Sequence, residues 1–306
     1  MSEFTDDHDD WQAHYGISDD LADEMGEYQS LAHHALEYGP TREAVRCFAW
    51  LVEQWARVAG IRDEQTMIHR AFLARAFAAD GQVRMAADEL QRLAEDRAAV
   101  FGPDDPQTLR TRGQLGQVLA RGGFPEEGIA VQLPLLDDRL RLFGPDAPGV
   151  FDTMGNLAEA YLLAGRAIEG RDLYADLLER RTRVLGVQHE DTVRTRLNLV
   201  AANAKTSTSP AKAVWDLKVA IDHFTETVGP LHDATLTARG HLADATLRTG
   251  DLETTMELLE DLIEDRLMVL GPDHPDTKRS QQKLADVERW WNEDADAAGD
   301  DGEATE

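Results

Sequence analysis

A short glycine-led segment recurs through the chain at a nearly fixed interval. It reads GPDHPDT at 271–277. Related segments begin at Gly60, Gly102, Gly144, Gly186 and Gly229. The intervals between successive glycines are 42, 42, 42, 43 and 42 residues. A fixed period of this size is typical of stacked repeats, in which each supersecondary unit packs mainly on its neighbours. We therefore expect a solenoid rather than a compact enzyme domain.

The glycine-led segment is interpreted as a turn between two helices rather than as a site. A glycine there supplies the left-handed position that ends a helix, and the proline after it prevents continuation. In GPDHPDT, His274 then stands where a helix N-cap is needed, with Pro275 at the first helical position. The same reasoning assigns the recurrent His189 and His232 to capping rather than to metal binding or catalysis.

Each repeat contains two segments in which apolar residues recur with helical spacing. In one repeat the first segment starts at Thr108 and the second runs from Glu126 to Phe143. The first segments carry a Leu followed by a small residue at 73–74, 115–116, 157–158, 242–243 and 284–285. The corresponding small residues of the second segments are Ala86, Gly128, Gly170, Ala213 and Thr255. Small residues let two helices approach closely, so we assign both positions to packing.

The chain resembles the tetratricopeptide repeat (TPR) family in these motifs. The segments that carry the resemblance are LGPDHPDT, NLAEAYLLAGR at 156–166 and RTRVLG at 181–186. More closely, they resemble the 42-residue subclass seen in kinesin light chains and in many bacterial proteins, over roughly residues 20–291. The resemblance implies an all-α, right-handed α-solenoid of about six helix-turn-helix pairs and a closing C-terminal helix.

The predicted organisation places this solenoid at residues 19–292. The expected pairs are 19–59, 60–101, 102–143, 144–185, 186–228 and 229–270, and the closing helix is 275–292. Trp290 and Trp291 are expected to pack back on the last pair. Acidic segments without Lys or Arg, 1–18 and 293–306, are expected to be disordered tails.

Composition narrows the function classes. The net charge is −27, which disfavours direct binding of nucleic acid by the whole chain because phosphates repel it. Apolar runs are too short to span a bilayer, and the N-terminus lacks the features of a secretory signal, so no membrane contact is expected. The single Cys47 fits a reducing compartment, and we expect a cytoplasmic location.

The chemistry of an enzyme is not indicated. Cys47 lies within an apolar helical segment and is interpreted as a small buried hydrophobe. His33 and Glu37 share one helical face at a spacing that suits two metal ligands, but no other His or Cys cluster joins them. Phosphate-binding glycine loops are lacking. We therefore predict a non-enzymatic protein without a cofactor or metal.

The resemblance implies that function resides on a concave groove formed by the first helix of each pair. The residues expected to bind a partner there are Arg110, Gly113, Gln117, Asp152, Gly155, Asn156, Glu159, Arg194, Asn198, His241 and Asp244. Mid-helix glycines in this set, such as Gly155, leave room either for a ligand backbone or for tighter curvature. The arginines suit peptide carboxylates or ordinary ion pairs. Asn156 and Asn198 serve either a ligand or hydrogen bonds between helices.

The function predicted from these features is a protein-interaction scaffold that binds a peptide segment or a partner protein. Two alternatives stay open. One is a regulatory sensor in which a peptide or small ligand changes the curvature of the superhelix. The other is an acidic decoy that occupies a nucleic-acid-binding protein. The sequence does not indicate the partner's identity or the oligomeric state.

Overall fold

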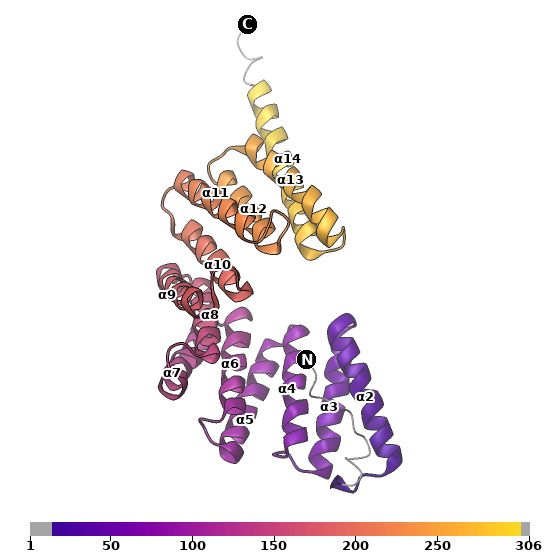
Figure 1. Ribbon diagram of the computed structural model, residues 1–306. Coiled ribbons are helices and arrows are strands. Elements are labelled where there is room, and N and C mark those ends of the chain that lie inside the picture. Colours follow the sequence, from indigo (N-terminus) through magenta and orange to yellow (C-terminus); the bar gives the residue numbers. More distant parts are fainter. Residues whose placement is uncertain (1–13, 301–306) are drawn as a thin grey trace. The chain divides into compact units, whose positions relative to one another are not determined.

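The computed structural model describes residues 14–300, with side chains described up to residue 293, and every regular element in that range is a helix. The helices are α2 (Asp19–Tyr38), α3 (Thr41–Val58), α4 (Glu64–Ala79), α5 (Val83–Phe101), α6 (Pro106–Arg121), α7 (Pro125–Phe143), α8 (Pro148–Leu163), α9 (Ala167–Leu185), α10 (Glu190–Thr206), α11 (Pro210–Thr227), α12 (Asp233–Leu247), α13 (Leu252–Leu270) and α14 (Pro275–Asp300). Six helix pairs and one further helix match the predicted all-α solenoid, which is confirmed (Figure 1).

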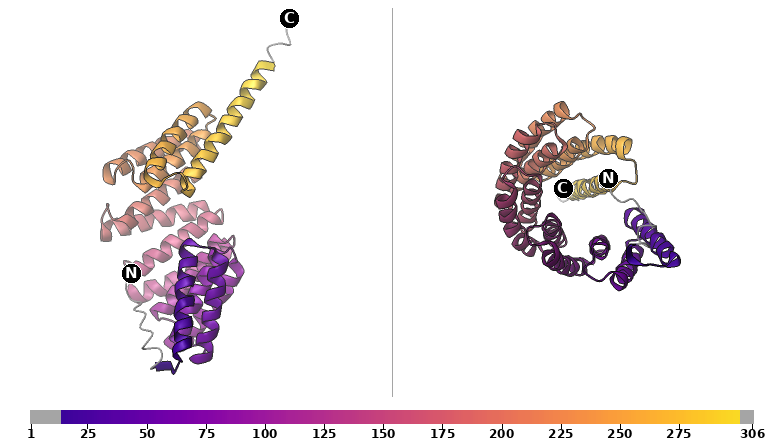
Figure 2. Two further views of the ribbon diagram at one scale, coloured as in Figure 1. Left: turned by 90° about the vertical axis from the view of Figure 1, so that its right-hand side faces the viewer. Right: turned by 60° about the horizontal axis from the view of Figure 1, so that its bottom comes forward.

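The helices form two units, here called unit 1 (residues up to 165) and unit 2 (residues from 166). Within each unit, every helix packs against the next helix in the chain (Figure 2). We call α2, α4, α6, α8, α10, α12 and α14 the first helices and the intervening ones the second helices. First helices of consecutive pairs also touch, as α6 does with α8 and α10 with α12.

The turns after the second helices have the conformation that the recurrent glycine allows. Gly102 ends α5 with φ 103° and ψ 157°, and Gly144 ends α7 with φ 78° and ψ 172°. This backbone region is open essentially to glycine alone, although its ψ differs from the left-handed helical value that we expected. The chain therefore leaves each second helix in an extended direction, toward the next N-cap.

The predicted caps are confirmed. The imidazole Nδ1 of His189 accepts from the Asp191 amide at 3.1 Å, and His232 accepts from the Ala234 amide at the same distance. His274 accepts from the Asp276 amide at 3.2 Å. These histidines satisfy amides that the first helical turn leaves unpaired.

Close packing within a pair depends on the small residues, as predicted. A Cβ on Gly128 of α7 would lie 2.7 Å from the carbonyl oxygen of Gly116 in α6 and 2.9 Å from the Ala120 Cβ. Any side chain at residue 128 would therefore push the two helices apart.

The ends of the described chain are more ordered than the predicted tail boundaries indicate. Ile17 is buried, and the Tyr15 ring packs edge-on against Trp55 at 5.2 Å. At the other end, α14 continues to Asp300. Trp290 and Trp291 pack back only in part, because they stay 43% and 45% exposed. The remaining parts of the predicted tails, 1–13 and 301–306, lie outside the described residues.

Among the described residues, none of the helices combines the length and the apolar character that crossing a bilayer requires.

Candidate functional site: the faces of the first helices

A buried or half-buried arginine links several second helices to the next first helix. It stands five residues before the turn glycine, at the buried Arg97, Arg181 and Arg266 and at the half-buried Arg139. In each case its Nη1 donates to a hydroxyl on the next first helix. The acceptors are Thr111 at 2.6 Å, Thr153 at 2.7 Å, Thr195 at 2.8 Å and Ser280 at 2.5 Å. Each arginine thus joins the second helix of one repeat to the first helix of the next.

Additional hydrogen bonds strengthen this contact in part of the chain. Arg139 also donates to the carbonyls of Gly149 at 2.7 Å and Leu109 at 3.2 Å. Partial burial removes water from the Arg139 guanidinium and thereby lowers its pKa. Hydrogen bonds to charged donors are stronger than neutral ones, so these contacts orient the following first helix.

In three repeats, a second arginine position pairs the first helix with its own second helix. Arg70 binds both Glu89 at 2.5 Å and Asp96 at 2.7 Å. Arg112 binds Asp138 at 2.7 Å, and an equivalent pair joins Arg239 to Asp265. The carboxylate in each pair directly precedes one of the buried positions described above. The Asp-Arg dipeptide near the end of the second helix therefore makes one contact inside its repeat and one contact to the next.

This network corrects the interpretation of the mid-helix glycines. Gly113 is buried, and a Cβ there would lie 3.6 Å from Leu135 Cδ2 and 3.8 Å from Arg139 Nη2 of α7. Gly240 faces Leu262 and Arg266 in the same manner. These two glycines contact the second helix of their own pair, so they do not form the floor of a ligand groove.

The remaining predicted residues of unit 1 form a polar row on α6 and α8. Gln117 Nε2 donates to Asn156 Oδ1 at 3.2 Å, and Arg121 Nη2 lies 2.9 Å from Glu159 Oε2. All four side chains belong to residues that are half-buried or exposed. The row therefore joins two first helices and still presents amide and charged groups at the surface.

Three further predicted residues lie on the same two helices. Arg110 on α6 and Asp152 on α8 are both exposed, and Gly155 is half-buried. Arg110 has no ion pair within the described part of the chain, whereas nearby arginines of its helix are taken up by Asp138 and Glu159.

The predicted residues of unit 2 lie on α10 and α12. Arg194 forms an ion pair with Asp191 one turn away, which is the ordinary alternative left open by the sequence. Asn198 Nδ2 donates to the Tyr174 hydroxyl at 3.4 Å, a contact between α10 and α9. Asp244 forms an ion pair with Lys283 of α14.

The surroundings of His241 on α12 change its pKa. The residue is half-buried, and burial lowers the pKa of His241, while Asp244 opposes this and Lys205 and Lys283 add to it. His241 is therefore neutral at pH 7 and can both donate and accept a hydrogen bond.

Two residues with potentially reactive side chains, Cys47 and His33, lie in unit 1. Cys47 is buried, and burial raises the pKa of its thiol, in agreement with the predicted packing role. His33 stands edge-on against Phe72 at 4.6 Å and Phe48 at 5.3 Å. Across residues 14–293, His, Cys, Asp and Glu side chains form no group of three that could hold a metal.

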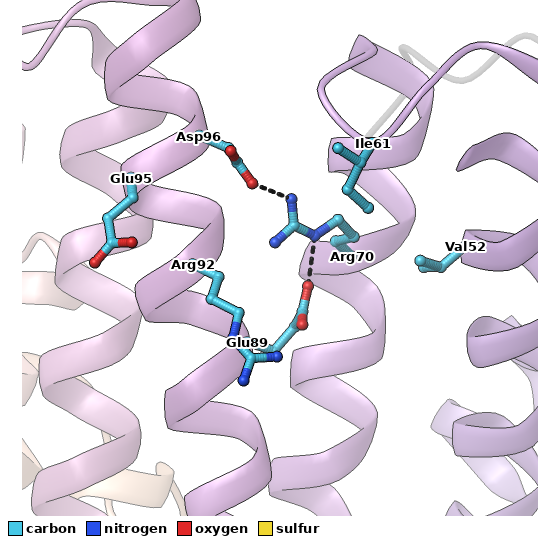
Figure 3. A pocket seen from close by; sticks show the side chains of 7 residues that line it. All are labelled: Val52, Ile61, Arg70, Glu89, Arg92, Glu95 and Asp96. Carbon is cyan, nitrogen blue, oxygen red and sulfur yellow. Dashed lines mark hydrogen bonds and ion pairs between the residues drawn. The ribbon is translucent and has the colours of Figure 1, made fainter. Parts of the chain in front are cut away.

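A pocket of about 380 Å³ lies between α3, α4 and α5 in unit 1 (Figure 3). Its walls are Val52, Ile61, Arg70, Glu89, Arg92, Glu95 and Asp96. The central Arg70 donates to two carboxylates. Burial acts to lower its pKa, but the hydrogen bonds that it donates to Asp96 and Glu89 outweigh this and raise it. The pocket is lined by this ion-pair network around Arg70, by the charged Arg92 and Glu95, and by the apolar Val52 and Ile61.

Sequence reasoning missed the buried arginines and their acceptors. Their signal was present as an Asp-Arg dipeptide that precedes the turn glycine at a constant offset, as in Asp96-Arg97 and Asp265-Arg266. Exposed and buried arginines occur at the same helical spacing. The constant distance of the Asp-Arg dipeptide from the turn glycine could therefore be interpreted as a contact between repeats only once the packing was known.

Comparison with known proteins supports this architecture. Residues 150–191 and 235–276 match the family model of the tetratricopeptide repeat. Among curated proteins, none matches the sequence.

Several solved structures share the fold. One is a crystal structure of nearly identical TPR-like repeats of a kinesin light chain-type protein from Podosopora anserina. Its TM-score is 0.57 and its sequence identity 20%, and the match covers 67% of this chain and 96% of that chain. BtubC (BKLC) from P. vanneervenii has TM-score 0.59 and 16% identity over 77% of this chain and 94% of its own. A Rap protein complexed with Competence and Sporulation Factor has TM-score 0.53 and 12% identity, and the match covers 95% of this chain and 81% of that chain. The chain has an all-α solenoid fold similar to that of the kinesin light chain-like TPR proteins, and two of its repeats match the TPR family model.

Proposed function

We propose that the chain is a non-enzymatic scaffold that binds a peptide segment or partner protein on the faces of its first helices. The observation that carries this proposal is the polar row of α6 and α8, Gln117, Asn156, Arg121 and Glu159, beside the exposed Arg110. These groups lie in the middle or at the end of helices whose packing is already supplied by buried leucines and threonines.

The chemistry of the row suits an extended peptide. The amides of Gln117 and Asn156 each offer donors and an acceptor, as a peptide backbone requires. Arg110 offers a planar guanidinium for a carboxylate, and Asp152 and Glu159 offer acceptors for a basic side chain. In unit 2, His241 and the Asp244–Lys283 pair are the corresponding polar groups on first helices.

The Rap structure supports the proposal by analogy of fold, since that protein was crystallised with Competence and Sporulation Factor. The proposed location is the cytoplasm, which suits a chain with a single, buried cysteine.

The test is a quantitative capture from lysate of the native host, followed by titration of the captured protein against purified chain. The binding variant is Arg110→Glu/Asn156→Ala, which changes the row without touching a buried side chain. The matched control is Arg141→Glu, an exposed arginine of α7 that pairs with Asp104 at 3.0 Å.

We expect wild type and the Arg141→Glu control to capture the same partner, and the double variant to lose at least tenfold in affinity, about 1.4 kcal/mol. Equal capture by all three proteins would remove the first-helix face of unit 1 as the binding surface. All three must first show the same cooperative unfolding.

A further inference from the structure

The contact between α10 and α11 departs from the pattern seen in the pairs α4–α5, α6–α7 and α12–α13. Six residues before the turn glycine, the second helices α5, α7 and α13 carry an aspartate that pairs with an arginine of their own first helix. In α11 this position is His223, six residues before Gly229. The arginine is retained as Arg196 on α10, so the usual arginine–carboxylate pair becomes an arginine–imidazole pair.

The geometry defines the protonation state of this histidine. Arg196 Nη1 and His223 Nε2 are hydrogen-bonded. The Thr227 hydroxyl also approaches Nε2, at 3.4 Å. Because a guanidinium can only donate, Nε2 must accept, and the imidazole that makes this contact is neutral.

Few other charges surround the pair. Arg196 is half-buried, and burial lowers its pKa. No carboxylate within residues 14–293 forms an ion pair with it. On α11 the adjacent acidic groups, Asp222 and Glu226, are exposed. The α12 side chains packed here, Ala234 and Ala238, belong to the apolar cluster around Phe224.

The arginine–hydroxyl contact made by Arg97, Arg139, Arg181 and Arg266 is absent here as well. The position of the buried arginine is taken by Phe224, and the hydroxyl position on the next first helix is Ala238, both fully buried. The turn from α10 to α11 also contains the extra residue of the 43-residue repeat, in the segment 206–210. At these two repeat positions, the Arg196–His223 contact is therefore the one polar link between α11 and a neighbouring helix in the described part of the chain.

We propose that Arg196 and His223 form a pH-sensitive latch between α10 and α11. At neutral pH the imidazole accepts from the guanidinium and holds the helices together. On acidification the imidazolium can no longer accept from Arg196 and places a second positive charge against it. The nearby Thr227 hydroxyl lies on α11 itself and cannot replace the link to α10, so the latch opens. Histidine is the side chain that ordinarily changes charge between pH 5 and 8. This inference concerns packing within unit 2 and does not depend on the proposed binding surface.

The test is hydrogen exchange of the full chain at pH 7.5 and 5.5, read by mass spectrometry and normalised to the intrinsic exchange rate at each pH. The variants are His223→Gln, which keeps a neutral acceptor at both pH values, and His223→Asp, which restores the pair found in the other repeats. The matched control is His232→Asn, which changes another titratable histidine of unit 2 while keeping an N-capping side chain.

For wild type and His232→Asn we expect protection of the α10 and α11 amides to fall about tenfold from pH 7.5 to 5.5. In His223→Gln and His223→Asp this pH step is lost, and His223→Asp is protected at both values. The proposal is overturned if wild type shows equal protection at both pH values, or if His223→Gln keeps the wild-type step. Circular dichroism at pH 5.5 separates local opening from global unfolding.

Discussion

The buried contact between Arg266 and Ser280 should hold α14 on unit 2. Arg266 is 6% exposed, and its Nη1 donates to Ser280 Oγ at 2.5 Å and to the Asp276 carbonyl at 3.0 Å. A third contact, from Nη2 to the Leu236 carbonyl, is long at 3.5 Å and adds little. We predict that Arg266→Leu destabilises the attachment of α14, because two acceptors on α14 lose their donor.

The magnitude follows from these contacts. Each buried acceptor left without its donor costs about 1–3 kcal/mol, so two acceptors give roughly 2–6 kcal/mol. Part of this loss is offset, because the folded protein no longer has to keep a guanidinium desolvated when Arg266 is replaced. Burial lowers the pKa of Arg266, and its Nε has no hydrogen-bond partner among the described residues. We therefore expect a net loss of about 2–4 kcal/mol for Arg266→Leu.

A double-mutant cycle with Ser280→Ala isolates the contact. The double variant removes donor and acceptor together, and the chain already contains an apolar version of this contact in Phe224 and Ala238. We expect the double variant to be about 1–2 kcal/mol more stable than the sum of the two single changes predicts. The assay is urea unfolding, combined with hydrogen exchange of α14 amides because terminal repeats can open separately. Additive single changes, within about 0.3 kcal/mol, would refute the reasoning.

Three further predictions concern single sites. Burial lowers the pKa of His69 to about 4. The unfolded chain binds a proton at this residue near pH 6.5, whereas the folded chain does so only near pH 4. The contribution of His69 to the free energy of unfolding is therefore complete above pH 6.5 and is lost as the pH falls toward 4. The loss is roughly 3 kcal/mol, measured by urea unfolding at both ends of the range, and an equally steep acid loss in His69→Gln would contradict this origin. Gly128→Ala should destabilise by about 1–3 kcal/mol through its clash with the Gly116 carbonyl, whereas Gly113→Ala, with only ordinary contacts at 3.6 Å or more, should stabilise by about 0.5–1 kcal/mol. Thermal unfolding ranks the pair, and the reverse order would show that the packing is misassigned. The Cys47 thiol, buried and with a raised pKa, should react with a thiol reagent at pH 8 at least a hundredfold faster in denaturant than in the native protein; comparable rates would place it at the surface.

Local features of the sequence were sufficient for the fold. The 42-residue period, the cap at His274 and the glycine at Gly102 each act on backbone within a few residues, so their effect can be derived without knowing what packs nearby. The small residues Gly116 and Gly128 were also assigned correctly, because their role depends only on adjacent helices of one pair.

The candidate site was predicted less completely, because exposure depends on which helix covers a residue. Gly113 was expected to form part of a groove, but α7 covers it. Arg194 was expected to face a partner, but Asp191 is within reach. Gln117 and Asn156 were placed on the first helices by their repeat position, and the structure adds that they bind each other.

The sequence by itself determined the number of repeats, the helix pairs and their caps, since these depend on local backbone preferences and on apolar spacing. Only the tertiary structure decided that Arg97, Arg139, Arg181 and Arg266 are bonded to the next repeat while Arg110 is exposed. The physical reason is that an arginine has the same helical preference in either setting. Its role depends on whether a hydroxyl and a carbonyl from another helix lie within hydrogen-bond distance, and that distance exists only after the helices have packed.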